Sequence, residues 1–268
     1  MARVNALPSW SFPCIVAMWL ALMSLHAEAT MLPSDSGPSI RSAVEETSSP
    51  ISIFVGKTTL AAGAVGRSAA TSRSLVIFLH GIRGSGSVMA QIGNAWTSRL
   101  PETRFVAPNA PFRHRSQGYQ WFAVDDQVMR PDRIKVARSA FDTLIGGIVE
   151  KEGFENDLDR VAFVGVSQGA IMALDAVATG RWKVGALVTF AGFMPFPPVT
   201  RSGTDTAIYL MHGGNDRTIP PAASVAAASQ LEAAGFTVTS RIFPGVGHTI
   251  SAEEAEEALN FLRQRFGD

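Results

Sequence analysis

Residues 161–174 read Val-Ala-Phe-Val-Gly-Val-Ser-Gln-Gly-Ala-Ile-Met-Ala-Leu, and this stretch indicates the architecture of the whole chain. Its first six residues form an apolar run that predicts a short buried strand, and Ala170–Leu174 continue as a helical pattern. Between them, Gly165-Val166-Ser167-Gln168-Gly169 fits the G-x-S-x-G pattern, in which a tight turn lifts a serine hydroxyl above a sheet. The stretch therefore predicts a strand–turn–helix unit with Ser167 as a nucleophile; the alternative is a serine that only caps a helix.

The same alternation of strands and helices continues on both sides of this unit. Short apolar, β-branched runs predict strands at Ile51–Val55, Leu75–Leu79, Arg104–Ala107, Val161–Val166, Gly185–Phe190, Ala207–Met211 and Thr237–Phe243. Helical patterns lie at Ser87–Arg99, Pro131–Lys151, Gln168–Thr179, Pro221–Ala234 and Ser251–Phe266, the last with a Ser251/Glu254 capping box. This order predicts one α/β domain over residues 51–268, with a mainly parallel central sheet and helices on both faces.

The composition limits the classes of partner. The 268 residues are 46% hydrophobic and 17% charged, with 23 basic against 23 acidic residues and a formal net charge of zero. Such a balance is typical of a globular protein with a buried core. A nucleic-acid-binding protein is expected to carry an excess of Lys and Arg, so we expect no nucleic-acid partner.

The N-terminus has the parts of a signal peptide in the usual order. Arg3 precedes an apolar run, Cys14–Leu25, and Ala27 and Ala29 have the spacing that a signal peptidase prefers. We expect residues 1–29 to be a signal peptide, residues 30–50 a flexible lead-in, and the mature protein to be exported, periplasmic or secreted, without stable membrane insertion. The alternatives are a membrane-anchoring helix, or a true start at Met31, which would leave the protein in the cytoplasm.

A serine hydroxyl needs a base, and the histidine that fits is His248. After a strand–turn–helix serine of this kind, the order along the chain is Asp or Glu and then His, each in a loop after a strand. His248 follows the last predicted strand in a glycine-rich loop, and Asp216 follows the strand Ala207–Met211. Asp205 is the main competitor as the acid but precedes that strand, and we expect Asp175 to face solvent. Ser167, His248 and Asp216 are therefore the predicted catalytic residues.

The loop His80–Gly86 follows the strand Leu75–Leu79 and is predicted to complete an oxyanion hole. One donor should be the backbone N–H of Gln168, directly after the nucleophile, and the second that of Ile82. We expect His80 to hold this loop by a hydrogen bond. The glycines match neither a Walker motif nor a dinucleotide-binding motif, and Cys14, the one cysteine, lies in the predicted signal. We therefore expect no cofactor and no metal.

The segment Ala107–Arg130 is rich in proline and aromatic residues. Long loops of this kind are often functional, so Trp121 and Phe122 are candidates for lining the acyl pocket. Core packing is the other interpretation of Trp121. Phe193, after the strand Gly185–Phe190, is a third candidate for this pocket.

Taken together, these motifs resemble the phospholipase/carboxylesterase family, which includes the acyl-protein thioesterases and bacterial carboxylesterases. The resemblance runs from about Leu75 to the C-terminus and rests on His80–Gly84, Pro108–Pro111, Trp121-Phe122, Gly165–Ala170, Ala191–Pro195, His212–Asp216 and Gly247-His248. It implies an α/β-hydrolase fold, the triad Ser167, Asp216 and His248, and an oxyanion hole at Ile82 and Gln168.

This sequence differs from the family pattern at a few positions, and these differences concern the choice of substrate more than the catalytic chemistry. Val166 stands where many family members have Phe, Gly81-Ile82-Arg83-Gly84 replaces Gly-Leu-Gly-Asp, and Ala123 stands where an Asp is common. We expect a carboxylic-ester hydrolase acting on small or medium acyl esters or thioesters through an acyl-enzyme. The alternatives are a secreted depolymerase of polyester or polysaccharide esters, and a non-catalytic binding protein on the same fold. The sequence does not indicate an oligomeric state.

Overall fold

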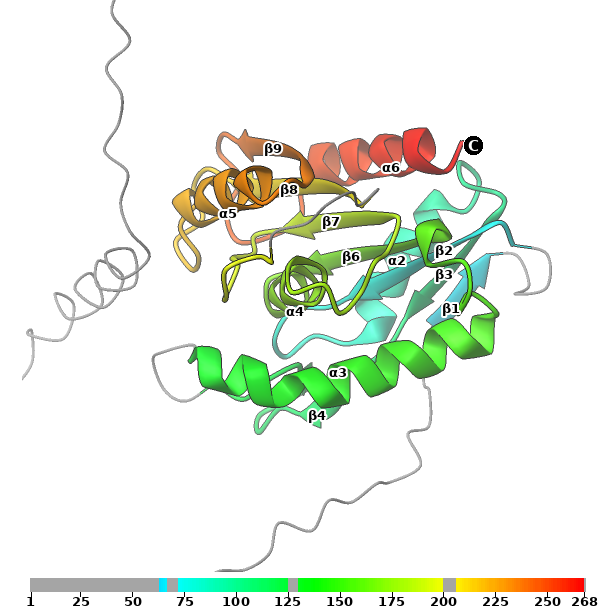
Figure 1. The fold of residues 1–268 in the computed structure, drawn as a ribbon, viewed down its shortest axis with the longest axis horizontal. Coiled ribbons are helices and arrows are strands. Elements are labelled where there is room, and N and C mark those ends of the chain that lie inside the picture. The colour runs from blue at the N-terminus through cyan, green and yellow to red at the C-terminus, as the bar shows by residue number, and fades with distance from the viewer. Residues whose placement is uncertain (1–62, 67–71, 125–129, 200–205, 268) are drawn as a thin grey trace, which may run out of the picture. The chain divides into compact units, whose positions relative to one another are not determined.

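A seven-stranded sheet lies at the centre of this computed structural model, which describes residues 63–66, 72–124, 130–199 and 206–267 (Figure 1). The strand order is β1-β3-β2-β6-β7-β8-β9; β1 runs antiparallel to β3, and the other neighbouring strands are parallel. The strands are β1 Gly63–Gly66, β2 Ser74–Leu79, β3 Thr103–Ala107, β6 Val161–Val166, β7 Ala186–Phe190, β8 Ala207–Gly213 and β9 Thr237–Phe243.

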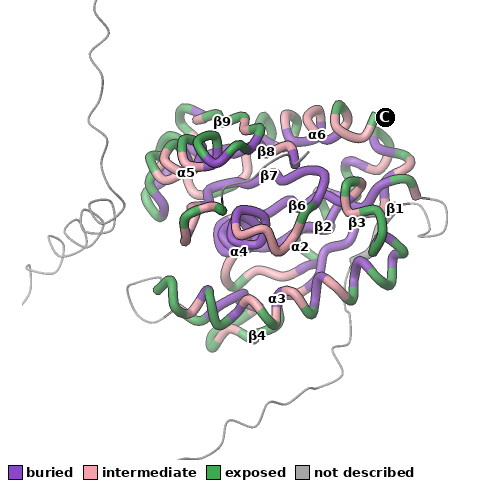
Figure 2. The backbone as a smooth tube through the Cα atoms, in the orientation of Figure 1, coloured by how far each residue is buried: buried purple, intermediate pink, exposed green. Residues whose placement is uncertain are grey.

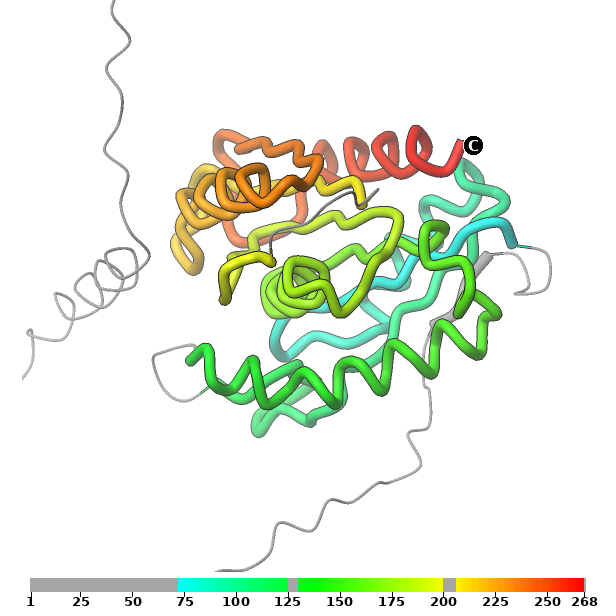
Figure 3. The backbone as a smooth tube through the Cα atoms, viewed as in Figure 1, coloured from blue at the N-terminus to red at the C-terminus, as the bar shows by residue number. Residues whose placement is uncertain are grey.

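Helices connect most of the parallel strands, as the sequence predicts. They are α2 Gly86–Trp96, α3 Pro131–Glu152, α4 Gln168–Ala178, α5 Ala222–Ala233 and α6 Ala252–Phe266, with a short 3₁₀ helix at Leu158–Arg160. The chain passes from β6 through α4 to β7 and from β8 through α5 to β9, which the backbone tube in Figure 3 follows. Because these strands are parallel, the loops that leave them all lie at one edge of the sheet.

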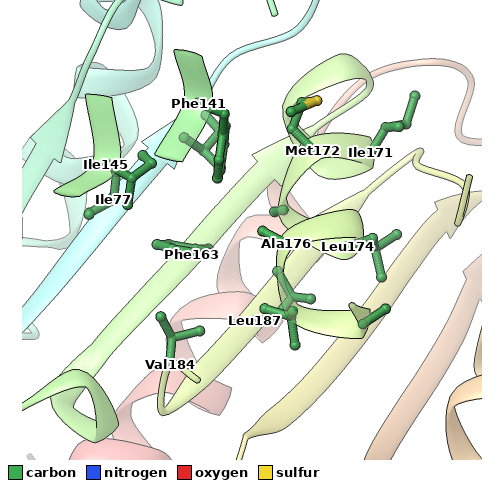
Figure 4. Close-up of a cluster of buried hydrophobic side chains, with 14 of the residues drawn as sticks. Ile77, Phe141, Ile145, Phe163, Ile171, Met172, Leu174, Ala176, Val184 and Leu187 are labelled. Atoms are coloured by element: carbon green, nitrogen blue, oxygen red, sulfur yellow. The ribbon is translucent and has the colours of Figure 1, made fainter. Parts of the chain in front are cut away.

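Two apolar layers cover the sheet, one on each face, because successive side chains of a strand point to opposite sides. Ile77 of β2, Phe163 of β6 and Leu187 of β7 face helices α3 and α4 (Figure 4), and α5 belongs to the same apolar layer. Their neighbours Val76 and Phe78 face the other way, toward α2 and α6. The predicted sheet with helices on both faces is therefore confirmed.

Helix α4 is buried along its whole length, and it packs on the sheet beside α3 (Figure 2). This burial corrects one expectation. Asp175 does not face solvent: its carboxylate is fully buried and accepts hydrogen bonds from Arg138 of α3 and from Arg181. A buried charge needs such partners, and neither arginine is adjacent to Asp175 in the sequence.

The bounds of the elements agree closely with the prediction. The strands Val161–Val166 and Thr237–Phe243 match residue for residue, and Ser251 caps α6 with Glu254 in the predicted capping box. The prediction missed β1 and a small antiparallel hairpin, β4 Phe112–Arg113 with β5 Tyr119–Gln120. The predicted strand Ile51–Val55, the signal peptide and the lead-in lie outside the described residues.

The described residues all belong to one compact unit, Gly56–Asp268. Within them, no helix combines the length and the apolar character that crossing a membrane requires.

Candidate active site

Ser167 lies in a strained turn at the carboxyl end of β6. Its backbone has φ 53° and ψ −119°, a conformation that few residues other than glycine adopt, and it is the N-cap of α4. The Ser167 N–H donates to the carbonyl of Phe190 at the end of β7, 3.0 Å away. The turn therefore holds the hydroxyl at the edge of the sheet where the strand loops gather.

The two glycines of the motif allow this turn to form. A Cβ on Gly165 would lie 2.7 Å from the backbone of Gly169 and Ala170, and one on Gly169 would lie 2.1 Å from the carbonyl oxygen of Leu79. Both distances are shorter than side-chain carbons tolerate. Helix α4 thus begins in direct contact with the end of β2, which fixes Ser167 against the loop that follows β2.

His248 connects Ser167 with Asp216. Its Nε2 lies 3.0 Å from the Ser167 Oγ, and its Nδ1 lies 2.7 Å from an oxygen of Asp216. The Asp216 carboxylate can only accept, so Nδ1 carries the ring proton and Nε2 is free to accept from the serine hydroxyl. The three predicted catalytic residues, far apart in the chain, form one continuous hydrogen-bonded chain.

Backbone hydrogen bonds lock the Asp216 turn to the His248 loop. The N–H of Gly214 donates to Phe243 at 2.7 Å, and that of Asn215 donates to Val246 at 2.8 Å. A Cβ on Gly213 would lie 2.4 Å from the carbonyl oxygens of Val246 and Gly247, so the two loops pack without room for a side chain there. The pairing of β8 with β9 therefore sets where the histidine and the aspartate meet.

Asp216 is fully buried and accepts four hydrogen bonds. Oδ1 accepts from the N–H groups of Thr218 and Ile219, and Oδ2 accepts from His248 and, at 3.1 Å, from His212 Nε2. Burial raises the pKa of the Asp216 carboxyl, but the hydrogen bonds from His248, Ile219 and Thr218 outweigh burial and hold the pKa below its ordinary value. The group is therefore a carboxylate at neutral pH.

His212, the last residue but one of β8, has a place in the site that the sequence did not indicate. Its ring is completely buried; Nδ1 lies 2.6 Å from the hydroxyl of Ser224, and Nε2 lies 2.8 Å from the carbonyl oxygen of Ile219. The one signal available in the sequence was its position at the end of a strand, four residues before Asp216. That signal does not reveal which groups surround the ring.

The loop after β2 lies directly beside the nucleophile. A Cβ on Gly81 would lie 3.4 Å from the Ser167 Cβ and 4.0 Å from its Oγ. Within the described residues, the backbone N–H groups of Ile82 and Gln168 donate to no acceptor. The N–H of Gln168 belongs to the first turn of α4, where a helix has donors without intrahelical partners. Two backbone donors are thus available on the two sides of Ser167.

His80 holds this loop, as the sequence predicts. Its Nε2 accepts the N–H of Ala110 at 2.9 Å, so Nδ1 carries the proton and donates to Gly81 at 2.7 Å. Burial lowers the pKa of His80, while the bond to Gly81 raises it, and the first effect is larger. His80 is therefore a neutral structural link and makes no hydrogen bond with Ser167.

The hairpin β4–β5 anchors the other side of the loop. The N–H of Arg83 donates to Tyr119 at 2.8 Å, and the N–H of Tyr119 donates to Gly84 at 3.0 Å. Arg83 has φ 63°, and the guanidinium of Arg113 lies over the Tyr119 ring, 4.5 Å from its centre. The loop therefore has a fixed backbone conformation on both sides of Ile82.

The side chain of Gln168 ties the start of α4 to the segment after β5. Its Oε1 accepts the N–H of Trp121, and its Nε2 donates to the carbonyl of Phe122, each at 3.0 Å. The Trp121 indole donates to His80 at 2.7 Å, and both aromatic side chains are buried in the core. Trp121 and Phe122 thus both pack in this core, and their role in an acyl pocket stays a prediction. Phe193 is partly buried at the edge of the same core.

Two further points complete the placement of the candidates. Asp205, the competing acid, lies outside the described residues. Within the described ranges, no group of three or more His, Cys, Asp or Glu side chains is arranged to hold a metal ion.

Comparisons with known proteins agree on one family. The model of the phospholipase/carboxylesterase family matches residues 61–265. The esterase YpfH of Escherichia coli is 30% identical over 195 residues, which cover 72% of this chain and 83% of that protein. The acyl-protein thioesterase 1 of Gibberella zeae is 28% identical over 220 residues, 71% of this chain and 89% of that one. The crystal structure of esterase PE8 has a TM-score of 0.69 and 28% identity, covering 77% of this chain and 99% of that chain.

Proposed function

Because the chain belongs to the phospholipase/carboxylesterase family and is a serine hydrolase of ester bonds, we propose that it works through Ser167, His248 and Asp216 by way of an acyl-enzyme. The observation that carries this proposal is the pair of hydrogen bonds at His248, 3.0 Å to Ser167 and 2.7 Å to Asp216. The first distance lies within the range in which a base takes a proton from a nucleophile, and the second is that of a hydrogen bond that orients the base.

The first half of the reaction follows from the direction of these bonds. The Ser167 Oγ attacks the acyl carbon while its proton moves to His248 Nε2, and the carbonyl oxygen becomes an oxyanion. The ionised Asp216 stabilises the imidazolium and keeps its ring in place. The bond to the leaving oxygen or sulfur then breaks, His248 returns the proton to the leaving group, and the acyl chain stays on Ser167.

The second half uses the same groups with water. His248 accepts one proton of the water molecule, the hydroxide oxygen adds to the acyl carbon, and the bond to Ser167 breaks as His248 returns the proton to its Oγ. The free carboxylic acid then leaves. The reaction consumes one water for each ester, and every proton is accounted for by His248, so these residues need no other acid or base.

The oxyanion is assigned to the backbone N–H groups of Ile82 and Gln168. The positions of these two residues support the assignment. Gln168 directly follows the nucleophile at the N-terminus of α4, and Gly81, which precedes Ile82, lies against the Ser167 side chain. A helix N-terminus adds a partial positive charge where the negative charge develops. Because the glycine neighbours and the Tyr119 pairing fix this loop, its donors need no rearrangement during the reaction.

The substrate class proposed is a small or medium acyl ester or thioester. It rests on relatives named as carboxylesterase and acyl-protein thioesterase and on a site built from neutral backbone donors. The sequence of residues 1–29 supports export as a further part of the proposal. N-terminal sequencing of the protein from a secretion-competent host tests the export: a mature start at Thr30 is expected, and an intact Met1 in the cytoplasm would contradict it.

A fluorophosphonate probe tests the activated serine directly. Mass spectrometry of the treated wild type should show a single adduct on Ser167, and this adduct should be lost in His248→Ala, because the hydroxyl then has no base. Ser74→Ala, which removes a buried hydroxyl bonded to Thr103 and away from the site, is the control and should still be labelled on Ser167. A folded wild type that forms no adduct would refute the proposal.

A further inference from the structure

His212 is held on both nitrogens in the interior of the protein. Nε2 lies 2.8 Å from the carbonyl oxygen of Ile219 and 3.1 Å from the Oδ2 of Asp216, and Nδ1 lies 2.6 Å from the hydroxyl of Ser224. The ring has no exposed surface. Its Asp216 contact is with the same carboxylate oxygen that binds His248, so two imidazoles share one oxygen.

The surroundings of the ring decide where its proton lies. Nε2 faces a carbonyl and a carboxylate, both of which only accept, so Nε2 must carry a hydrogen. The hydroxyl of Ser224 can donate either to Nδ1 at 2.6 Å or to the carbonyl of Gly192 at 3.5 Å. The first distance is that of a good hydrogen bond and the second is at its limit. Ser224 therefore donates to Nδ1, and His212 is the neutral Nε2–H tautomer.

We propose that His212 is a positioning residue that fixes the Asp216 carboxylate for His248. This inference rests on the proposed function and deepens it. His212 shares its single Nε2–H between the Ile219 carbonyl oxygen at 2.8 Å and Oδ2 at 3.1 Å. Together with the Thr218 and Ile219 N–H groups on Oδ1, it restrains rotation of the carboxylate about its Cβ–Cγ bond. Because the ring is neutral, it orients Oδ2 without cancelling the negative charge that stabilises the imidazolium of His248.

The loss of the His212 donor has two expected consequences. The carboxylate gains freedom to rotate, which lowers the rate of the chemical step more than it lowers substrate binding. It also loses one stabilising donor and becomes a stronger acceptor for the Nδ1 proton of His248. Among the described residues, the titratable groups that hydrogen-bond to this carboxylate are His212 and His248, and the neighbouring Arg217 is exposed.

Two substitutions separate a donor from a space-filling group. His212→Gln places an amide N–H near the position of Nε2, whereas His212→Leu fills a similar space without a donor. The measurements are kcat and KM for p-nitrophenyl butyrate between about pH 5 and pH 9, the range in which a histidine base titrates. For the Leu variant, we expect kcat to fall roughly tenfold to hundredfold, the scale of a hydrogen bond to a charge, with KM little changed. The acidic limb of the pH profile of kcat should move to higher pH in this variant.

The Gln variant should recover most of kcat and the position of the acidic limb. Ser74→Ala, which removes the buried bond between Ser74 and Thr103, is the control for a general loss of stability and should leave the pH profile unchanged. If His212→Leu fails to fold, His212→Asn replaces it, because its amide N–H lies at the Nδ1 position. The His212→Asn variant should show the low kcat and shifted pH profile of His212→Leu, and not the recovered values of His212→Gln.

The outcomes distinguish this inference from the proposed function. A wild-type kcat and acidic limb in the donor-free variant would overturn the role of His212, and so would equal losses in the Leu and Gln variants. Ser167→Ala is measured beside them: if that variant keeps its turnover, the proposed function fails, whatever the His212 variants show.

Discussion

Replacement of Asp216 by asparagine reverses one hydrogen bond in the proposed triad while it preserves shape. The Thr218 and Ile219 N–H groups must still meet an acceptor, so the amide oxygen of the substituted side chain has to stay at the Oδ1 position. Its NH₂ group then stands where Oδ2 was, facing the Nδ1 of His248, while the Nε2–H of His212 loses this acceptor and keeps its bond to the Ile219 carbonyl oxygen. The Nδ1 of His248 must accept from the NH₂ group, which moves the ring proton to Nε2. His248 then donates toward Ser167 and cannot take its proton.

The size of the effect follows from this change of tautomer. A histidine in the wrong tautomer costs a serine-type triad about 10⁴ in kcat, or about 5 kcal/mol in the barrier. Asp216 is fully buried and does not reach the substrate, so KM should stay within a few-fold of the wild-type value. Initial rates of p-nitrophenyl butyrate hydrolysis at neutral pH give both kcat and KM. The enzyme concentration is taken from the protein concentration.

A matched control separates chemistry from stability. Asp142→Asn changes another hydrogen-bonded aspartate, the partner of Arg181 and Trp182, which makes no contact with the triad. It should keep kcat near the wild-type value, although its unfolding midpoint falls. A folded Asp216→Asn variant with kcat within tenfold of wild type would contradict the tautomer argument. A rise in KM alone, with kcat intact, would contradict it too.

Three further predictions concern stability and the turn. Asp175→Asn should lower the free energy of unfolding by roughly 3–5 kcal/mol in urea titrations, because the partly buried Arg138 loses its counter-charge and Arg181 keeps only Asp142; a loss no larger than that of a surface Asp132→Asn control would contradict this. Gly169→Ala should abolish fluorophosphonate labelling or folding, since its Cβ would lie 2.1 Å from the Leu79 carbonyl oxygen; Gly146→Ala, with open space around its Cβ, should do neither. The folded-state pKa of Asp216 is lowered, so its contribution to stability is complete above the unfolded pKa of about 4 and is lost as the pH falls through the folded value. Acid unfolding of wild type and Asp216→Asn should therefore converge at low pH, and parallel curves would refute this.

The sequence was sufficient to predict the strands of the sheet and the candidate catalytic residues at its edge. Buried parallel strands are continuous apolar runs, so Val161–Val166 could be bounded from hydrophobicity alone. The order of serine, acid and histidine, each after a strand, then placed Ser167, Asp216 and His248 at the same edge. Short elements gave no such signal: β1 contains two glycines, and each strand of the β4–β5 hairpin has two residues.

Side-chain environments were harder to predict because they depend on distant elements. Asp175 lies on a helix that is apolar nearly all round, a pattern of a helix buried on every side, but aspartate alone suggested a solvent-facing position. Its partner Arg138 is 37 residues away in the sequence, on α3. No local sequence pattern predicts that α3 packs against α4. The same holds for His212, since its partners Ile219 and Ser224 approach only after β8 and α5 pack.

The geometry of the proposed triad therefore depends on two different kinds of constraint. Ser167 is placed by local backbone: a positive φ, two glycines and a helix that starts against β2. His248 and Asp216 are placed by the pairing of β8 with β9 and by the bonds that join their loops. A substitution in the first set should abolish labelling at every pH. A substitution in the second set that leaves His248 and Asp216 themselves in place should instead shift the pH dependence of a serine that is still labelled. Labelling and pH profiles measured on the same variants thus distinguish which constraint a residue serves.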